Sequence, residues 1–306
     1  MTVGITFSNG LEAVVCTDIR ASTGGRESDS FKKLEKVESE KYHGVIFGCG
    51  SGNVIEGIFK KMPSSSQKHN KIEDFINAVK EELYSGFYDA KEQYIKKTKK
   101  EIEIKSGLFT NEDEKMQFTR SNISECIHNY NGMQNSTVIF ITIYDKGANR
   151  IRNFYINEGG TGEVYANITA IGSGTDGANM YFSQKMQGVD EKKLKKKDIF
   201  FATMNSYNWA TINQGVGGTP RVALIDKDGV RLFTNEEAST STNVSGAYLA
   251  ELIDKKYALG AMESIIGKAA DYEEIARKLD LTQKALMSAA IPASFWQHLA
   301  NKDYHD

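Results

Sequence analysis

The sequence predicts an α+β fold of four layers (αββα), in which two antiparallel sheets pack face to face and helices cover their outer faces. Strand pairs alternate with pairs of amphipathic helices along the chain. Short polar turns, such as Ser8-Asn9-Gly10, join the strands of each pair, as antiparallel neighbours require. The chain has 306 residues, of which 40% are hydrophobic and 25% charged, so it is globular and long enough to bury a large core.

Elements are assigned from periodicity and turn residues. In chain order we expect strands at 2–8, 11–18, 31–38 and 43–49, helices at 52–62 and from 72 onward, strands at 137–144 and 150–156, one or two short strands before 172, helices at 176–187 and 197–213, and strands at 221–226 and 229–234. A polar loop is expected at 22–30. The run Val45-Ile46-Phe47 is apolar without interruption, which is typical of a strand covered on both faces.

The composition predicts one main domain at 1–235 and a helical carboxy-terminal extension at 236–306. Within the main domain, the charged stretch at about 95–132 is expected to be a solvated insertion. The extension begins with a Ser/Thr-rich run, and its helices are expected at 244–266, 272–289 and 293–301. The spacing of residues 275–286 is that of a helix-turn-helix, but a packing helical hairpin explains it equally and no basic face accompanies it.

Charge and cysteine content exclude several classes of function. A net charge of −2 gives no electrostatic footprint for nucleic acid or an anionic membrane. No run of eighteen apolar residues and no signal peptide is present, so we expect a cytoplasmic protein without a membrane anchor. Cys16, Cys49 and Cys126 are far apart and the histidines lack ligand spacing, so neither a disulfide nor a metal is expected.

Three residues near the start suggest chemistry. If Met1 is removed, Thr2 carries a hydroxyl and a free amine on one residue, and the amine can serve as the base that activates the hydroxyl. Lys33, in the third expected strand, would lower the local proton affinity. Asp18, at the end of the second strand, would hold that lysine. A structural ion pair and a surface threonine remain the alternative for any of these residues taken alone.

Several segments together resemble the proteasome β-type subunits and the bacterial peptidase rings, which are amino-terminal nucleophile (Ntn) hydrolases. The matching segments are Thr2-Val-Gly-Ile-Thr6, Thr17-Asp-Ile-Arg-Ala-Ser22, Lys32-Lys-Leu-Glu-Lys-Val37, Gly44-Val-Ile-Phe-Gly48, Ile171-Gly-Ser-Gly174 and Gly215-Val-Gly-Gly218. The resemblance covers roughly residues 2–94 and 136–234. It implies the Ntn sandwich fold and a hydrolase that assembles into rings.

The resemblance also implies roles in catalysis. Thr2 would be the nucleophile, with Asp18 and Lys33 as its supporting pair. Ser173 would assist proton transfer at the threonine amine. Gly48 would donate its backbone N–H to the oxyanion, an interaction worth on the order of 3 kcal/mol in acyl-transfer enzymes.

Further positions follow from the same resemblance. The remaining roles are the brace for Asp18 (Arg20), backbone pairing with an extended substrate (Ser22), the first specificity pocket (Ala21, Phe31 and Ile46), and the shell that supports the active site (Asn213 and Val216, where the family usually has Asp and Ser). The apolar pocket residues favour an apolar substrate side chain.

We therefore expect a threonine-type peptidase that cleaves peptide or protein substrates after Met1 removal, in a ring-like homo-oligomer, without cofactors. An ATPase or regulatory partner is not identified by the sequence. One alternative is an Ntn amidohydrolase acting on a small molecule or one specific bond. Another is an inactive structural ring subunit, which a retained Met1 would favour, and a DNA-binding regulator is the last.

Overall fold

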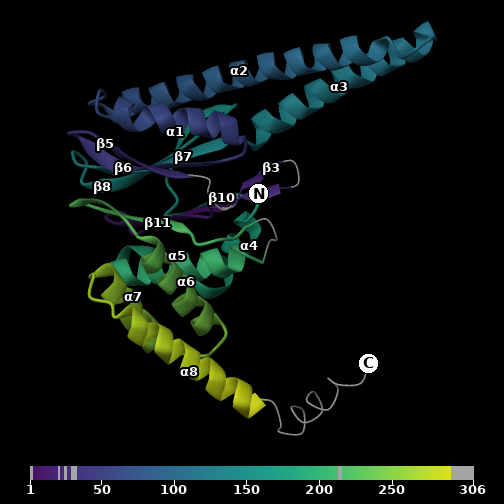
Figure 1. Ribbon diagram of the computed structural model, residues 1–306. Helices are drawn as coiled ribbons and strands as arrows, with labels where there is room; N and C mark the ends of the chain where they lie inside the picture. Colours follow the sequence, from purple (N-terminus) through teal and green to yellow (C-terminus); the bar gives the residue numbers. More distant parts are fainter. Residues whose placement is uncertain (1–2, 20, 24–25, 29–32, 213–215, 291–306) are drawn as a thin grey trace, which may run out of the picture.

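The computed structural model describes residues 3–19, 21–23, 26–28, 33–212 and 216–290. Within them, two five-stranded antiparallel sheets lie face to face, and helices cover the outer face of each sheet (Figure 1). The predicted α+β sandwich with a helical carboxy-terminal part is confirmed.

The first sheet has the strand order β10–β1–β2–β11–β12. Its strands are β1 (Val3–Ser8), β2 (Ala13–Thr17), β10 (Ile168–Gly172), β11 (Arg221–Asp226) and β12 (Gly229–Leu232). The predicted hairpin of β1 and β2 is present, but residues 9–12 form a longer connection than a two-residue turn. The Asn9 side-chain oxygen accepts hydrogen bonds from the backbone N–H groups of Leu11 and Glu12, and Gly10 adopts a φ of 92°.

The second sheet has the order β5–β6–β7–β8–β9. Its strands are β5 (Leu34–Glu38), β6 (Tyr42–Cys49), β7 (Val138–Asp145), β8 (Arg150–Asn157) and β9 (Gly160–Val164). All of β6 is buried, as the apolar run predicted. Side chains alternate along it: Val45 and Phe47 face the first sheet, and Ile46 faces the helices.

Helices α1 (Gly52–Ser66), α2 (Ile72–Ser106) and α3 (Glu112–Ser136) lie on the side of the second sheet (Figure 1). On the side of the first sheet lie α4 (Thr175–Lys185), α5 (Lys196–Ala210), α6 (Asn235–Leu249), α7 (Lys255–Ile266) and α8 (Tyr272–Ala290), together with a 3-10 turn at Glu191–Lys193. No helix in the described ranges combines the length and the apolar character needed to cross a membrane.

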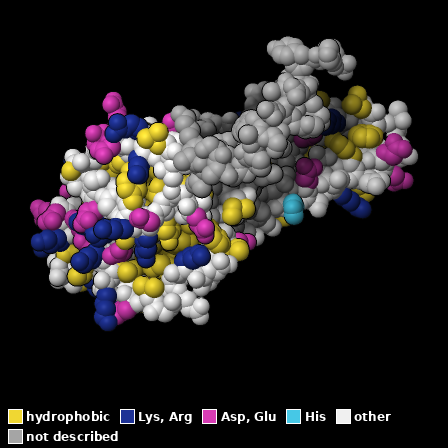
Figure 2. All heavy atoms as spheres, turned by 90° about the horizontal axis from the view of Figure 1, so that it is seen from below, with side chains coloured by type: hydrophobic (Ala, Val, Ile, Leu, Met, Phe, Trp, Pro, Cys, Tyr) yellow, Lys and Arg dark blue, Asp and Glu magenta, His cyan; other side chains and the backbone are white. Residues whose placement is uncertain are grey.

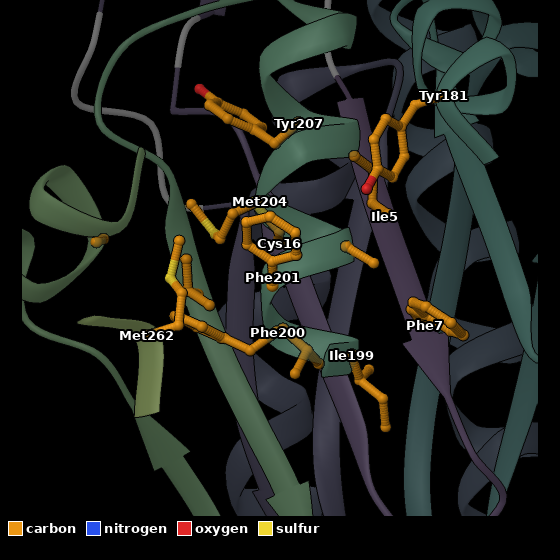
Figure 3. Close-up of a cluster of buried hydrophobic side chains, with 14 of the residues drawn as sticks. Ile5, Phe7, Cys16, Tyr181, Ile199, Phe200, Phe201, Met204, Tyr207 and Met262 are labelled. Carbon is orange, nitrogen blue, oxygen red and sulfur yellow. The ribbon is translucent and has the colours of Figure 1, made fainter. Parts of the chain in front are cut away.

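Three apolar clusters hold these layers together. Between the sheets, Phe47 of β6 packs on Phe140 of β7, with ring centroids 5.2 Å apart. Under α1 and α2, buried side chains such as Phe75 cover the second sheet. On the outer face of the first sheet, Ile5 and other strand residues meet Phe200 and its neighbours on α5 (Figure 3). Each such fully buried side chain contributes about 1.5–3 kcal/mol from burial.

The charged stretch at 95–132 forms the outer part of a helical hairpin that leaves the body (Figure 1). The last buried residue of α2 is Phe87, and α3 buries none of its side chains. We call residues 88–136 the arm. Its two helices touch through aromatic pairs, Tyr94 with Tyr130 and Phe109 with Phe118.

The predicted polar loop at 22–30 instead contains a small two-stranded sheet, β3 (Ala21–Thr23) with β4 (Arg26–Ser28). The helix expected at 272–289 is present as α8, which passes through 275–286 without a turn, so the spacing typical of a helix-turn-helix does not form that motif here. Nothing in Asp280-Leu281 breaks a helix, since neither residue is glycine or proline. The helix expected at 293–301 lies outside the described residues.

The predicted helix at 244–266 is two helices, and the first begins earlier than expected. Thr234 and Glu237 form a capping box at the start of α6: each side chain accepts a hydrogen bond from the other's backbone N–H. Within the Ser/Thr-rich run, Ser241 and Thr242 donate to carbonyls one turn back. The run is therefore part of a helix.

Arg231 of β12 ties the carboxy-terminal helices to the first sheet. Its guanidinium donates to the carbonyls of Ile265 and Ile266, the last two residues of α7, and pairs with Glu237 of α6. A cation at a helix carboxyl end is favourable, because unsatisfied carbonyls and the helix dipole place negative charge there. One side chain thus links β12, α6 and α7.

Candidate active site

Asp18 and Lys33 form a buried ion pair. Lys33 Nζ donates to Asp18 Oδ1 at 2.9 Å, and the two side chains are 3% and 0% exposed. The backbone N–H of Val3 donates to the same Oδ1 at 3.0 Å. The other oxygen, Oδ2, is buried and makes no hydrogen bond to the residues that the structure describes. A buried carboxylate with a spare oxygen is uncommon and calls for a functional explanation.

The pKa of Asp18 lies above its ordinary value of 3.8. Burial is the largest cause, because it penalises the charged carboxylate. The positive charge of Lys33 and the hydrogen bonds from Lys33 and Val3 offset part of this rise. The lysine and the carboxylate therefore meet directly beside the start of β1.

Three strand ends meet at Val3, the residue that follows Thr2 in the chain. In the β1–β10 ladder Val3 lies opposite Gly172, and the β1–β2 ladder continues past Thr17 because the Asp18 N–H donates to the Val3 carbonyl at 3.2 Å. Antiparallel pairing in both directions therefore fixes the position of Val3 relative to Asp18 and Gly172.

Gly48 lies on the same level as Lys33. The β5–β6 ladder ends at the pair Leu34–Phe47, so Lys33 and Gly48 are the next residues of the two strands. On the other side, Gly48 pairs with Ile139 of β7, and a Cβ at Gly48 would lie 2.8 Å from Ile139 Cδ1. A side chain at Gly48 would therefore require Ile139 to shift.

Cys49 is close enough to the pair for the charges of both Lys33 and Asp18 to act on it. Burial raises the pKa of its thiol to about 11, so the thiol is protonated at neutral pH. A protonated, buried thiol is a poor nucleophile. We therefore do not expect Cys49 to act as a nucleophile.

Sequence reasoning missed two glycines that allow this packing. A Cβ at Gly4 would lie 2.7 Å from the Phe47 ring, so β1 can approach β6 only without a side chain there. A Cβ at Gly174 would lie 2.8 Å from Val3 Cβ and 2.9 Å from Val216 Cγ2. Gly174 was recognised only as part of a Gly-Ser-Gly motif, and nothing in a single sequence marks which side chains approach a glycine.

The structure brings together only some of the predicted residues. Ser173 is exposed and follows Gly172, the partner of Val3, directly before α4. Val216 is buried against Gly174. Ile46 is fully buried in the cluster under α1 and α2. For Ala21 and Ser22 the backbone alone is described, paired with Ser28 and Glu27 of β4. Thr2, Arg20, Phe31 and Asn213 lie outside the described residues.

A cavity of about 350 Å³ opens between α1 and α2, near the end of β6. Ser51 and Val54, which follow Cys49 closely in the chain, line one side of it, and Asp89 and Lys97 of α2 line the other. Asp18, Lys33 and Gly48 do not line this cavity. Across the described part of the chain, no cluster of three or more His, Cys, Asp or Glu side chains could hold a metal ion.

Two facing antiparallel sheets with helices on both outer faces define the broad class of Ntn-type sandwiches. The structure is similar to that of a Gly-1 mutant of Anbu from Hyphomicrobium sp. strain MC1, with a TM-score of 0.55 and 13% sequence identity. The alignment covers 83% of this chain and 99% of that chain. No family model matches the sequence, and no curated protein matches it. At this identity the likeness concerns the fold.

Proposed function

We propose that this protein is an Ntn hydrolase of the threonine type, a peptidase whose nucleophile is Thr2 after removal of Met1. The observation that carries the proposal is the buried Asp18–Lys33 pair, which also holds the Val3 N–H, directly after Thr2 in the chain. A buried pair of this kind costs desolvation energy, and its position beside a candidate nucleophile gives a reason for that cost.

In the proposed reaction, the Thr2 amine takes the proton of the Thr2 hydroxyl, and the oxygen attacks the substrate carbonyl carbon. The backbone N–H of Gly48 stabilises the oxyanion. The amine then passes the proton to the leaving nitrogen, which leaves an acyl-enzyme ester at Thr2. Water, deprotonated by the same amine, hydrolyses the ester and regenerates the hydroxyl.

Lys33 and Asp18 act on the nucleophile without changing their own bonds. The ammonium of Lys33 lowers the proton affinity of the amine and the hydroxyl, and Asp18 fixes the ammonium. Ser173, next to the partner of Val3, assists the proton transfer. The peptide substrate and a ring-like homo-oligomer belong to this proposal through the resemblance to proteasome β-type subunits, and so does a cytoplasmic location.

An epoxyketone inhibitor tests the mechanism, because it forms its adduct with a hydroxyl and an amine of one residue. We expect intact-mass measurement to find Met1 removed and one inhibitor bound at Thr2. Thr2→Ala should abolish the adduct, and Thr2→Ser should keep it, since serine retains both groups. Lys33→Met should slow labelling at least about 100-fold. A retained Met1 with no adduct would contradict the proposal and favour an inactive ring subunit.

A further inference from the structure

The arm lacks the tertiary contacts that normally stabilise long helices. α2 continues past Phe87 to Ser106, a distance of roughly 28 Å at 1.5 Å per residue. α3 has 25 residues and none of them is buried. Most helices in proteins depend on packing of an apolar face, which beyond Ala90 and Met133 at the base is supplied here by the other helix of the arm. The outer part of the arm is therefore a helical hairpin that no other described layer of the chain covers.

Apolar side chains are exposed along α3. Met116, Ile123 and Ile127 are 50%, 47% and 55% exposed, and their spacing of seven and four residues places them on one face. On α2, Tyr88 is 64% exposed at the base of the arm. Figure 2 shows hydrophobic side chains on the part of the molecule that extends to the right, which is the arm. These side chains give α3 a line of apolar residues that is open to solvent.

The charges of α2 are divided between its two halves. Residues 81–92 hold four carboxylates and one lysine, whereas residues 96–105 hold five lysines and two carboxylates. Most of these groups are unneutralised: the four lysines at 96, 97, 99 and 100 and the carboxylates at 81, 89 and 92 make no ion pair with the described residues. The separation leaves one acidic and one basic patch on a single helix.

A helix with one acidic and one basic half is complementary to itself when two copies run antiparallel. Acidic partners alone would explain the lysines, and basic partners alone the carboxylates, but a second copy explains both at once. From this charge complementarity, we propose that the arm pairs with the arm of a second copy of this chain, antiparallel and around a two-fold axis. Such an isologous contact uses the same surface on both copies.

Residue spacing defines the register of this contact. With the two-fold axis near residue 94, Glu92 of one copy lies opposite Lys96 of the other, and Asp89 lies opposite Lys99. Glu92, Lys96 and Lys99 are spaced by four and three residues, so they share one face of α2. This stripe lies opposite Tyr94, which packs on Tyr130 of α3, so it faces away from α3. Its charges set the orientation and the register of the contact.

Two charge-reversal variants of the full chain test the pairing. The outer variant carries Lys96→Glu, Lys99→Glu and Lys100→Glu, and the inner variant carries Glu81→Lys, Asp89→Lys and Glu92→Lys. We expect each variant alone to have half the particle mass of the wild type by light scattering. An equimolar mixture should recover the wild-type mass, because each acidic half then faces a basic one. Circular dichroism checks that both variants stay helical.

The control variant places three reversals elsewhere, at the exposed Lys192, Lys193 and Lys195, and should keep the wild-type mass. The proposal is overturned if the wild type has the same mass as the outer variant, or if the mixture stays at the mass of its components. None of these variants changes Thr2, Asp18 or Lys33, so a failure here leaves the proposed hydrolase untouched.

Discussion

Around the start of β1, strands from both sheets converge and nearly every side chain is buried, whereas in the arm two helices pack mainly on each other. Both regions contain lysine–carboxylate pairs of similar length: Lys33–Asp18 at 2.9 Å, with side chains 3% and 0% exposed, and Lys105–Glu101 at 2.6 Å, with side chains 50% and 37% exposed. The N–O distances alone do not show which pair contributes more to stability. Exposure to solvent determines that contribution, because water screens the Lys105–Glu101 pair and is excluded from the Lys33–Asp18 pair.

The largest difference should appear when each pair loses its lysine. Lys33→Met leaves Asp18 buried without its cation and should lower the free energy of unfolding by about 3–5 kcal/mol. Lys105→Met removes an exposed pair within one helix and should leave the free energy of unfolding nearly unchanged. Urea denaturation of both variants measures the contrast. Equal losses would mean that the Asp18 environment is wetter than its burial implies.

Glycine replacement should give a smaller effect of opposite sign in the two regions. A Cβ at Gly44 would lie 2.1 Å from the carbonyl oxygen of Thr142 on the adjacent strand, so Gly44→Ala should destabilise by about 1–3 kcal/mol. Gly132, inside α3, has open space around it, and Gly132→Ala should stabilise by about 0.5–1 kcal/mol. Thermal melts of the two variants should shift in opposite directions, and a shared direction would contradict the packing described for β6 and β7.

The smallest effect concerns pH. Burial raises the pKa of Asp18, so from about pH 4 upward the unfolded chain loses a proton that the folded chain keeps, and stability falls as pH rises through that window. The hydrogen bond from Lys105 lowers the pKa of Glu101, so its stabilisation is lost as pH falls below 4.5. Unfolding measured from pH 3.5 to 7 should therefore change slope oppositely in Asp18→Asn and Glu101→Gln. Identical profiles of stability against pH for the two variants would contradict the difference in burial between Asp18 and Glu101.

The sequence predicted most of the sandwich because its strands and helices have strong periodicity, as in the wholly apolar β6. It missed features in which polar residues satisfy each other locally. The Ser/Thr-rich run appeared to be a loop, yet Ser241 and Thr242 bond to carbonyls within α6. The Thr234–Glu237 capping box was visible in the sequence and marks the true start of that helix.

For the candidate site, the roles of Asp18 and Lys33 as a pair came from their residue types and the resemblance, and the structure pairs Lys33 with Asp18. The Val3 N–H that donates to Asp18 is a backbone group, so no pattern of side chains in the sequence predicts this hydrogen bond. The close approaches at Gly4 and Gly174 involve β6 and the segment after α5, far away in the chain. Such contacts follow from the register of two sheets, which a single sequence does not encode locally.

The contacts of Arg231 limit how the carboxy-terminal helices can be altered or lost in evolution. Because this side chain binds the end of α7 and Glu237 of α6, and because Val244 and Met262 share the apolar cluster of β1 and β2, these helices cover part of the same core as the sheet. A gene shortened after β12 would encode a protein with that core open on one side and Arg231 without its partners. The tail can be exchanged only together with the residues it covers.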